Sequence, residues 1–212
     1  MVDKKYISIE GAIGVGKTTL AKKISNTMDY NILLESYSDN PFLKSFYEDR
    51  KSNSFVTQIY FLLKRYEQIS SIVDNEKLLV SDFYFGKDEL FARLNLSDLE
   101  FDMYTNIKNK LNFTPPKPDL IIYLQASTDI LLDRIKSRGL EFERSITRKY
   151  IESVNEMYMN HFHNYNQSPV LIINTSNVNI NNDKDYQLLI SEISSDIKGK
   201  KYFNPVSSIK NV

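Results

Sequence analysis

One motif near the N-terminus restricts the possible folds of this chain more than any other feature. Residues 11–18 read Gly-Ala-Ile-Gly-Val-Gly-Lys-Thr and match the phosphate-loop pattern G-x-x-x-x-G-K-[ST]. A short apolar run at Tyr6 to Glu10 precedes the motif, and a helical pattern from Thr18 to Met28 follows it. A glycine-rich turn that only packs a helix on a strand is the alternative. The complete motif between a strand and a helix favours the phosphate loop.

The parts of this loop have separate roles toward a nucleoside triphosphate. Its glycines let the backbone wrap around phosphate oxygens, while its N–H groups and the N-terminus of the following helix supply positive potential. Lys17 is expected to reach the β and γ phosphates, and the hydroxyl of Thr18 to ligate Mg²⁺. The residues expected to bind the nucleotide are Gly11, Ala12, Ile13, Gly14, Val15, Gly16, Lys17, Thr18 and Thr19. The motif by itself says only that a triphosphate is held.

The rest of the chain alternates short apolar runs with longer helical patterns. The runs at residues 31–35, 78–82, 120–124 and 170–173 are too short and too continuous for amphipathic helices. The clearest helical pattern covers about residues 54–73, and others fit 98–110, 128–137, 147–164 and 185–197. This alternation predicts a three-layer α/β P-loop fold with a five-stranded parallel sheet and helices on both faces. We predict a single domain over residues 1–197, a surface loop at 176–185 and a C-terminal tail over 198–212.

Charge and composition exclude several classes of partner. Lys and Arg (27) balance Asp and Glu (27), so no net field favours nucleic acid or an acidic membrane surface. The absence of cysteine excludes disulfides and thiolate metal sites. The N-terminus has no signal-peptide pattern, and no stretch reaches the roughly 20 apolar residues of a membrane span. We therefore expect a cytoplasmic protein that acts on a small molecule, with no nucleic-acid or membrane partner.

Two carboxylates follow apolar runs at the predicted strand ends. Glu35 ends the second run and Asp82 ends the third. Because the carboxyl ends of parallel strands meet at one edge of a sheet, both should face the phosphate loop. One carboxylate there could accept a proton from an attacking hydroxyl, and the other could orient Mg²⁺. A lone acid at a strand end often only marks the start of a loop, but two that converge favour chemistry.

Further motifs occur in a fixed order along almost the whole chain. After the phosphate loop and Glu35 come Asn40-Pro41-Phe42-Leu43 with Phe46-Tyr47, residues 55–65, Asp82 with Lys87-Asp88 and Phe91-Ala92, residues 118–124, and Arg134 to Gly139 with Glu143. This series resembles the deoxynucleoside kinase family. The resemblance implies transfer of the γ-phosphoryl group of ATP, with Mg²⁺, to the 5′-hydroxyl of a deoxynucleoside in nucleotide salvage. It also implies a homodimer formed by helix packing.

The resemblance also assigns roles around the acceptor sugar. Glu35 resembles the base that removes the proton of the 5′-hydroxyl, and Asp82 resembles the acid that helps to place Mg²⁺. Tyr47 and Glu143 resemble the two groups that hold the sugar 3′-hydroxyl.

A second set of residues is similar to the family's base-reading groups. Gln58 resembles the glutamine that pairs with the base edge, and Arg65 with Asp88 resembles the pair that reads exocyclic groups. Gln58 and Arg65 lie seven residues apart, so they share one helix face. The alternative for that face is simple solvation. Arg65 with Asp88 resembles the purine and deoxycytidine branches of the family more than the thymidine branch, so the resemblance implies a purine deoxynucleoside or deoxycytidine as acceptor.

Residues 133–139 resemble the family's lid. Arg134 and Arg138 lie four residues apart and share a face, so they could close over the triphosphate and stabilise charge on the transferring phosphoryl group. The alternative is an ordinary basic helix end, which the helix dipole favours.

Two positions depart from the family pattern. Phe83 follows Asp82, and Leu140 follows Gly139, where the family commonly has arginines. Lys87 or Arg144 could substitute for the missing cations. Two other functions therefore stay open. One is a nucleoside monophosphate kinase of the thymidylate kinase type, which needs cations near the acceptor, and the other is a nucleotide-binding regulatory module that has lost its chemistry.

Overall fold

The structure is a computed structural model that describes residues 4–71 and 78–205. Within these residues, six parallel strands form one sheet in the order β2-β3-β1-β4-β5-β6. The strands are β1 (Tyr6–Gly11), β2 (Asn31–Leu33), β3 (Leu79–Ser81), β4 (Leu120–Gln125), β5 (Val170–Asn174) and β6 (Lys200–Phe203).

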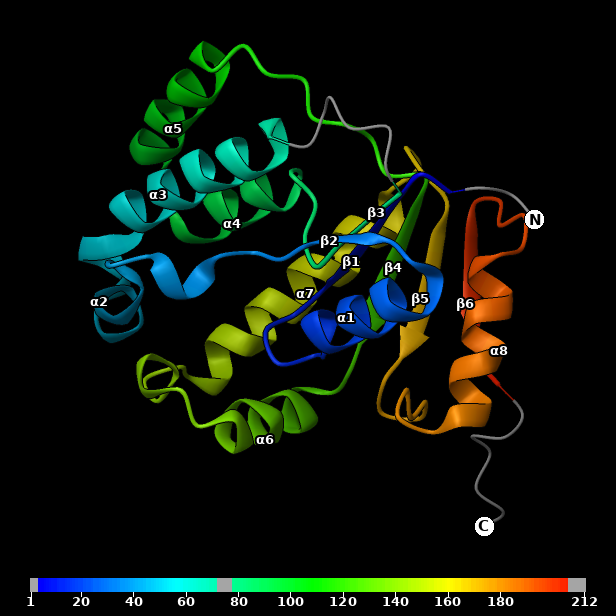
Figure 1. Cartoon of the computed structure of the whole chain (residues 1–212). Coiled ribbons are helices and arrows are strands. Elements are labelled where there is room, and N and C mark those ends of the chain that lie inside the picture. The colour runs from blue at the N-terminus through cyan, green and yellow to red at the C-terminus, as the bar shows by residue number, and fades with distance from the viewer. Residues whose placement is uncertain (1–3, 72–77, 206–212) are drawn as a thin grey trace.

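Helices cover both faces of this sheet. Those of the described chain are α1 (Lys17–Met28), α2 (Leu43–Glu48), α3 (Arg50–Ser70), α4 (Lys87–Asn95), α5 (Asp98–Lys110), α6 (Thr128–Arg138), α7 (Arg148–Asn164) and α8 (Asp183–Ile193). Figure 1 shows α1 on one face of the sheet and α7 on the other. A hydrogen bond joins α8 to α1: the hydroxyl of Tyr186 donates to Thr27 Oγ1 at 2.8 Å. The predicted three-layer α/β fold is confirmed.

The central strand β1 is buried along its whole length and divides its side chains between the two layers. Ile7 and Ile9 pack in one apolar cluster with Leu20 of α1. Glu10 points the other way, toward α7, where the hydroxyl of Tyr158 donates to its carboxylate. The period of two along β1 therefore places apolar groups under α1 and a buried acid under α7.

The strand register brings three chain segments to the same edge of the sheet. Gly11 of β1 pairs with Leu124 of β4, and Leu33 of β2 pairs with Ser81 of β3. The phosphate loop follows β1, Glu35 follows β2, and Asp82 follows β3. Ligands of open parallel sheets bind at this edge, so the fold gathers these groups where a ligand is expected.

The position directly after Asp82 belongs to the core. Phe83 is fully buried and packs in a second apolar cluster with Leu62 of α3, Ala92 of α4 and Tyr104 of α5. An arginine there would leave a buried cation among apolar groups. Core packing therefore accounts for the departure from the family pattern at Phe83.

The predicted count of five strands is wrong by one. β6 comes from the segment that we predicted as a tail, and its Tyr202 pairs with Ile172 of β5. Three of its four residues are exposed. Charged residues on an edge strand protect a sheet from pairing with further strands. Such a strand lacks the continuous apolar run by which buried strands are recognised in a sequence. The last seven residues of the predicted tail lie outside the described residues.

The predicted helices agree with the structure except at their ends. α3 begins earlier than predicted, at Arg50, because the side chain of Asp49 caps it by accepting from the N–H of Ser52. Its predicted end at Val73 lies outside the described residues. The short helices α2 and α4 were not predicted, since six and nine residues give too little periodicity.

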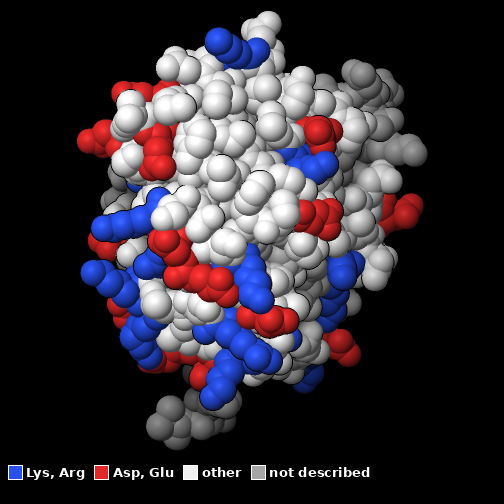
Figure 2. All heavy atoms as spheres, turned by 90° about the vertical axis from the view of Figure 1, so that its left-hand side faces the viewer, with Lys and Arg blue, Asp and Glu red and all other residues white. Residues whose placement is uncertain are grey.

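The surface carries charges of both signs. On the face that Figure 2 shows, Lys and Arg side chains are interspersed with Asp and Glu, and neither sign forms a continuous stripe there. None of the helices in the described part of the chain combines the length and the apolar character that a membrane crossing requires.

Candidate active site

A cavity of about 640 Å³ opens at the carboxyl edge of the sheet. Its size lies within the range typical of small-molecule sites. The phosphate loop forms one end, and α2, α3, α4, α6 and α7 contribute to the wall together with segments between them that carry Glu35, Asp82 and Glu143. Residues 175–181 line it as well, and all of them except Thr175 belong to the segment 176–185 that we predicted as a surface loop.

The phosphate loop depends on glycine at its first residue. Gly11 has φ of +146°, and a Cβ atom there would lie 2.4 Å from the carbonyl oxygen of Leu124. Only glycine lets β1 stay this close to β4 at the point where the loop begins. The N-terminus of α1 has no side-chain cap and no acid in its first turn, so its N–H groups are left to an anion.

Lys17 lies over the loop that it follows. Its Nζ donates to the carbonyl oxygens of Gly11 at 2.8 Å and Ala12 at 3.1 Å. Burial lowers the pKa of Lys17 to about 8, and the nearby ammonium of Lys87 adds to this effect. An anionic phosphate beside Lys17 would favour its charged form.

A chain of hydrogen bonds joins the phosphate loop to the two predicted carboxylates. The hydroxyl of Thr18 donates to Asp82 Oδ2 at 2.5 Å, and the backbone N–H of Glu35 donates to Asp82 Oδ1 at 2.7 Å. Among the described residues, no three His, Cys, Asp or Glu side chains form a metal-binding cluster. A hydroxyl and one carboxylate still suit Mg²⁺, which usually takes one or two protein ligands together with substrate phosphates and water.

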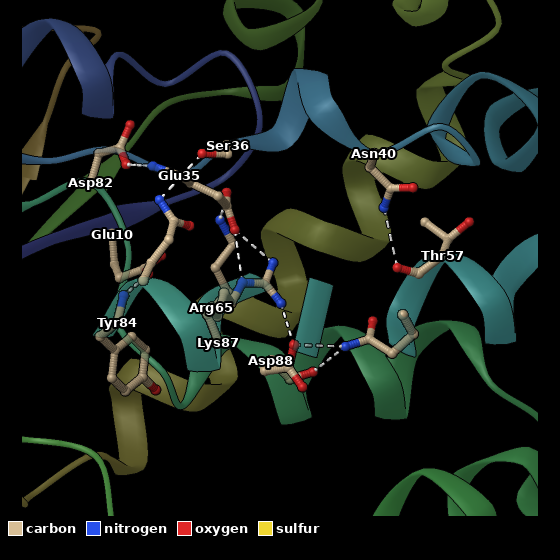
Figure 3. A network of polar contacts seen from close by, with 12 residues as sticks. Glu10, Glu35, Ser36, Asn40, Thr57, Arg65, Asp82, Tyr84, Lys87 and Asp88 are labelled. Atoms are coloured by element: carbon tan, nitrogen blue, oxygen red, sulfur yellow. Dashed lines mark hydrogen bonds and ion pairs between the residues drawn. The ribbon is translucent and has the colours of Figure 1, made fainter. Parts of the chain in front are cut away.

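The carboxylate of Glu35 is held by two cations (Figure 3). Arg65 donates to Oε1 from Nε at 2.8 Å and from Nη2 at 2.6 Å, and Lys87 Nζ donates to Oε2 at 2.6 Å. Burial by itself would raise the pKa of Glu35, but Lys87 and Arg65 outweigh burial and hold it at about 2. Glu35 is therefore ionised at any working pH and is a weak base.

The residues expected to read the base, Gln58, Arg65 and Asp88, form one buried group, which we term the base-reading cluster. Arg65 pairs through Nη1 with Asp88 Oδ1, and Gln58 Nε2 donates to the same oxygen and to the backbone oxygen of Asp88, both at 3.0 Å. Gln58 and Arg65 are 4% and 3% exposed. The alternative of a solvated helix face is therefore wrong.

The two arginines of the predicted lid line the cavity and already have partners. Arg134 donates to the carbonyl oxygen of Val15 at 3.2 Å, and to Oγ1 and the carbonyl oxygen of Thr175 at 2.9 and 3.0 Å. Arg138 forms a bidentate pair with Glu143. Burial lowers the pKa of Arg134 and raises that of Glu143, the latter against the effect of Arg138. Arg134 thus ties the phosphate loop to the loop after β5.

Tyr47 lies in the same cavity as Glu143. Its ring stacks on Phe142 with centroids 6.5 Å apart and planes 7° from parallel. Burial, followed by the nearby Tyr150 and Glu143, raises the pKa of the Tyr47 phenol well above its usual value. The phenol stays protonated and can donate.

Two positions at the site are recognised only from the structure. Of the two candidate replacements for the missing arginines, Lys87 lines the cavity, whereas Arg144 is exposed and is not among the lining residues. Glu10 was missed altogether. Its buried carboxylate accepts from the N–H of Gly11 at 3.2 Å and of Tyr84 at 2.8 Å, which ties the phosphate loop to the turn after Asp82. The only sequence signal was an acid at the end of an apolar run.

Comparison with known proteins agrees with this geometry. Residues 7–198 match the family model described as deoxynucleoside kinase. The chain is 37% identical over 153 residues to deoxyguanosine kinase of Bacillus subtilis (strain 168), which covers 70% of this chain and 74% of that protein. It is 32% identical over 198 residues to deoxyadenosine/deoxycytidine kinase of the same organism, with 89% and 91% covered.

A solved structure extends the likeness to three dimensions. Deoxyadenosine kinase from M. mycoides with bound dATP superposes with a TM-score of 0.79 and 26% identity, over 90% of this chain and all of that one (100%). The residues that the family model matches include the phosphate loop, the carboxylates Glu35 and Asp82, and Gln58, Arg65 and Asp88. The chain therefore belongs to the deoxynucleoside kinase family of phosphotransferases.

Proposed function

We propose that this chain transfers the γ-phosphoryl group of ATP to the 5′-hydroxyl of a deoxynucleoside, with Glu35 as the proton acceptor. One observation carries the proposal. Glu35 lies between the phosphate loop, to which it connects through Asp82 and Thr18, and the base-reading cluster, to which it connects through Arg65. A sugar between these two ends would present its 5′-hydroxyl to Glu35.

The proposed transfer is direct and in line. The 5′-oxygen forms a bond to the γ-phosphorus, the bond from that phosphorus to the β,γ-bridging oxygen breaks, ADP leaves, and the proton goes to Glu35. Thr18 and Asp82 would hold Mg²⁺, which neutralises phosphate charge when bound. Lys17 would bind the β and γ phosphates. Arg134 and Arg138 remain the proposed cations for the transferring group, supported by their place in the cavity wall.

The charges favour an uncharged acceptor at the end of the cavity where Glu35 and Gln58 lie, which we term the acceptor end. In the described chain, the cations that line this end are Arg65, Lys87 and Arg138, and each is paired with a carboxylate. A monophosphate kinase of the thymidylate kinase type would need a cation left for the second phosphate. The other alternative is a nucleotide-binding regulatory module without chemistry, and such a module would have no use for a proton acceptor at Glu35.

The acceptor base and the form of the protein are also proposed. A purine deoxynucleoside or deoxycytidine is the proposed acceptor, because Arg65 and Asp88 are paired and the two Bacillus subtilis relatives are named for these substrates. A cytoplasmic homodimer is the proposed form of the protein, on the strength of the family resemblance. Sedimentation velocity at several concentrations would measure the mass of the particle.

The proposed function is tested by incubating the protein with ATP, Mg²⁺ and each of deoxyadenosine, deoxyguanosine, deoxycytidine, thymidine and their 5′-monophosphates. Formation of a nucleoside monophosphate supports the proposal and names the base. Transfer only to a monophosphate would move the chain to the other kinase class. Tight ATP binding without transfer to any acceptor would support the regulatory module.

Lys87 is proposed to take over the task of the arginine that Phe83 replaces, and this leads to a pH prediction. The ionised form of Glu35 is the active one, so kcat/KM falls as pH drops through its pKa. Methionine at position 87 removes a cation that lowers this pKa. The acid limb of the kcat/KM profile in Lys87→Met should therefore move upward by about 1–3 pH units.

Arg144→Met is the matched control, since Arg144 was the other candidate and is exposed. In assays from pH 4 upward, kcat/KM of Arg144→Met should show no acid limb from Glu35, as in the wild type, because the pKa of Glu35 at about 2 lies below this range. An unmoved limb in Lys87→Met, or a moved limb in Arg144→Met, would contradict the assignment.

A further inference from the structure

Asp88, at the centre of the base-reading cluster, is held by a residue outside the cavity. Tyr104 lies on α5, is fully buried and is not among the residues that line the cavity. Its hydroxyl donates to Asp88 Oδ2 at 2.7 Å. Burial, together with the charge of Asp88, raises the pKa of the Tyr104 phenol, so the phenol remains a hydrogen-bond donor at every working pH.

The two oxygens of Asp88 have separate tasks. Oδ1 accepts from Arg65 and Gln58, which line the cavity, and Oδ2 accepts from Tyr104, which does not. Figure 3 shows Asp88 below Arg65, with its carboxylate facing the guanidinium. Because Asp88 is fully buried, no solvent can replace the Tyr104 hydroxyl at Oδ2. The hydroxyl therefore sets the rotation of the carboxylate.

The orientation of Gln58 follows from that of Asp88. The Gln58 Nε2 group donates both to the backbone oxygen and to Oδ1 of Asp88. An amide NH₂ has two hydrogens, so both are used, and the side-chain oxygen of Gln58 is the group left for a ligand. Arg65 has five N–H hydrogens, and its contacts to Asp88 and Glu35 leave a remainder for a ligand. The pattern of acceptor and donor offered to a base thus depends on how Asp88 is held.

We infer that Tyr104 is a positioning residue for base selection: it fixes Asp88 from α5, and Asp88 in turn orients Arg65 and Gln58 toward the exocyclic groups of the nucleobase. This inference rests on the proposed function. Tyr104 itself touches no substrate. Without its hydroxyl, Asp88 rotates toward its remaining donors, and Arg65 and Gln58 lose the fixed geometry by which they distinguish one base from another.

The test compares Tyr104→Phe with the wild type on two nucleosides. One is the best substrate of the panel above, and the other is its ring-matched 2′-deoxyribosyl analogue that lacks the exocyclic amino or oxo group. For the substituted nucleoside, kcat/KM should fall about tenfold or more, mainly through KM, because a hydrogen bond to a buried charged group is lost. For the unsubstituted analogue it should change by less than about twofold, and KM for ATP should stay unchanged.

Tyr186→Phe is the matched control, since it removes another buried tyrosine hydroxyl that is hydrogen-bonded far from the base-reading cluster. It should leave both nucleosides unaffected. Replacement of Tyr104 by 4-aminophenylalanine, which keeps a donor at the ring position of the hydroxyl, should restore the wild-type ratio of the two nucleosides. A structural role alone would lower kcat/KM equally for both nucleosides, and that outcome overturns the inference.

Calorimetric binding of the two nucleosides, measured beside turnover, separates this inference from the proposed function. Wild-type protein that binds the substituted nucleoside but does not phosphorylate it would contradict the proposed function. The ratio of dissociation constants for the two nucleosides in Tyr104→Phe would then still test the inference. Equal ratios in the variant and the wild type, or no nucleoside binding by the wild type, overturn it.

Discussion

Glutamine in place of Glu35 should lower kcat for the best deoxynucleoside by about 10²-fold, the lower end of the range of about 10²–10⁴ for a lost general base. The amide cannot take the proton of the 5′-hydroxyl. The effect lies at the lower end because Lys87 and Arg65 hold the pKa of Glu35 at about 2, which makes it a weak base. The measurement is kcat at saturating ATP and nucleoside.

The same substitution should also lower the free energy of unfolding. The side chain of Glu35 is 11% exposed and forms ion pairs with Arg65 and Lys87, both of which are buried. Removal of one partner from a buried ion pair costs about 3–5 kcal/mol. Urea unfolding of wild type and Glu35→Gln would measure this loss, and folded protein at the assay temperature must be verified before the rates are compared.

The control for both effects is Glu67→Gln, which makes the same change of charge in an exposed pair with Lys64. An exposed pair contributes little, so kcat should stay unchanged and the free energy of unfolding should fall by less than about 1 kcal/mol. If Glu35→Gln keeps kcat within about threefold of the wild type while it stays folded, Glu35 is not the proton acceptor.

Methionine in place of Lys17 should lower kcat/KM for ATP by on the order of 10²–10³-fold, the cost of one lost donor to transition-state charge. Lys17 lies on the phosphate-loop carbonyls, and the other cations that line the cavity in the described chain already have partners. Among the described residues, no other cation donates to the carbonyl oxygens of Gly11 and Ala12, so none takes the place of Lys17. Stability should not fall with activity, because burial already disfavours the charged form of Lys17.

Lys22→Met on the same helix is the matched control, since Lys22 is exposed and carries the same charge. Initial rates over a range of ATP concentrations and thermal unfolding curves of both variants would test the prediction. Unchanged kcat/KM for ATP in Lys17→Met would exclude a role for this lysine in binding the triphosphate or stabilising its transition state.

The sequence could place several site residues on the fold because local patterns mark them. The phosphate loop is continuous in sequence, and Glu35 and Asp82 follow runs whose parallel pairing sends their ends to one edge of the sheet. The same signals could not show the edge strand β6, because its exposed lysines hide it among loop residues. Arg134 shows the limit at the lid: spacing predicts its helix face, but its contact with Thr175 depends on how the loop after β5 lies.

By itself, the sequence determined the phosphate loop, the three-layer parallel fold and the edge at which the carboxylates gather, since these follow from short motifs and from periodicity within single elements. Tertiary structure alone decided the polar partners. Arg65 meets Glu35 across 30 positions, and Glu10 meets Tyr158 across 148. Such pairs exist only when separate helices and strands pack at particular angles, and no local pattern records that packing. For the same reason only the structure shows that Lys87 contacts Glu35 and that the Tyr104 hydroxyl contacts Asp88.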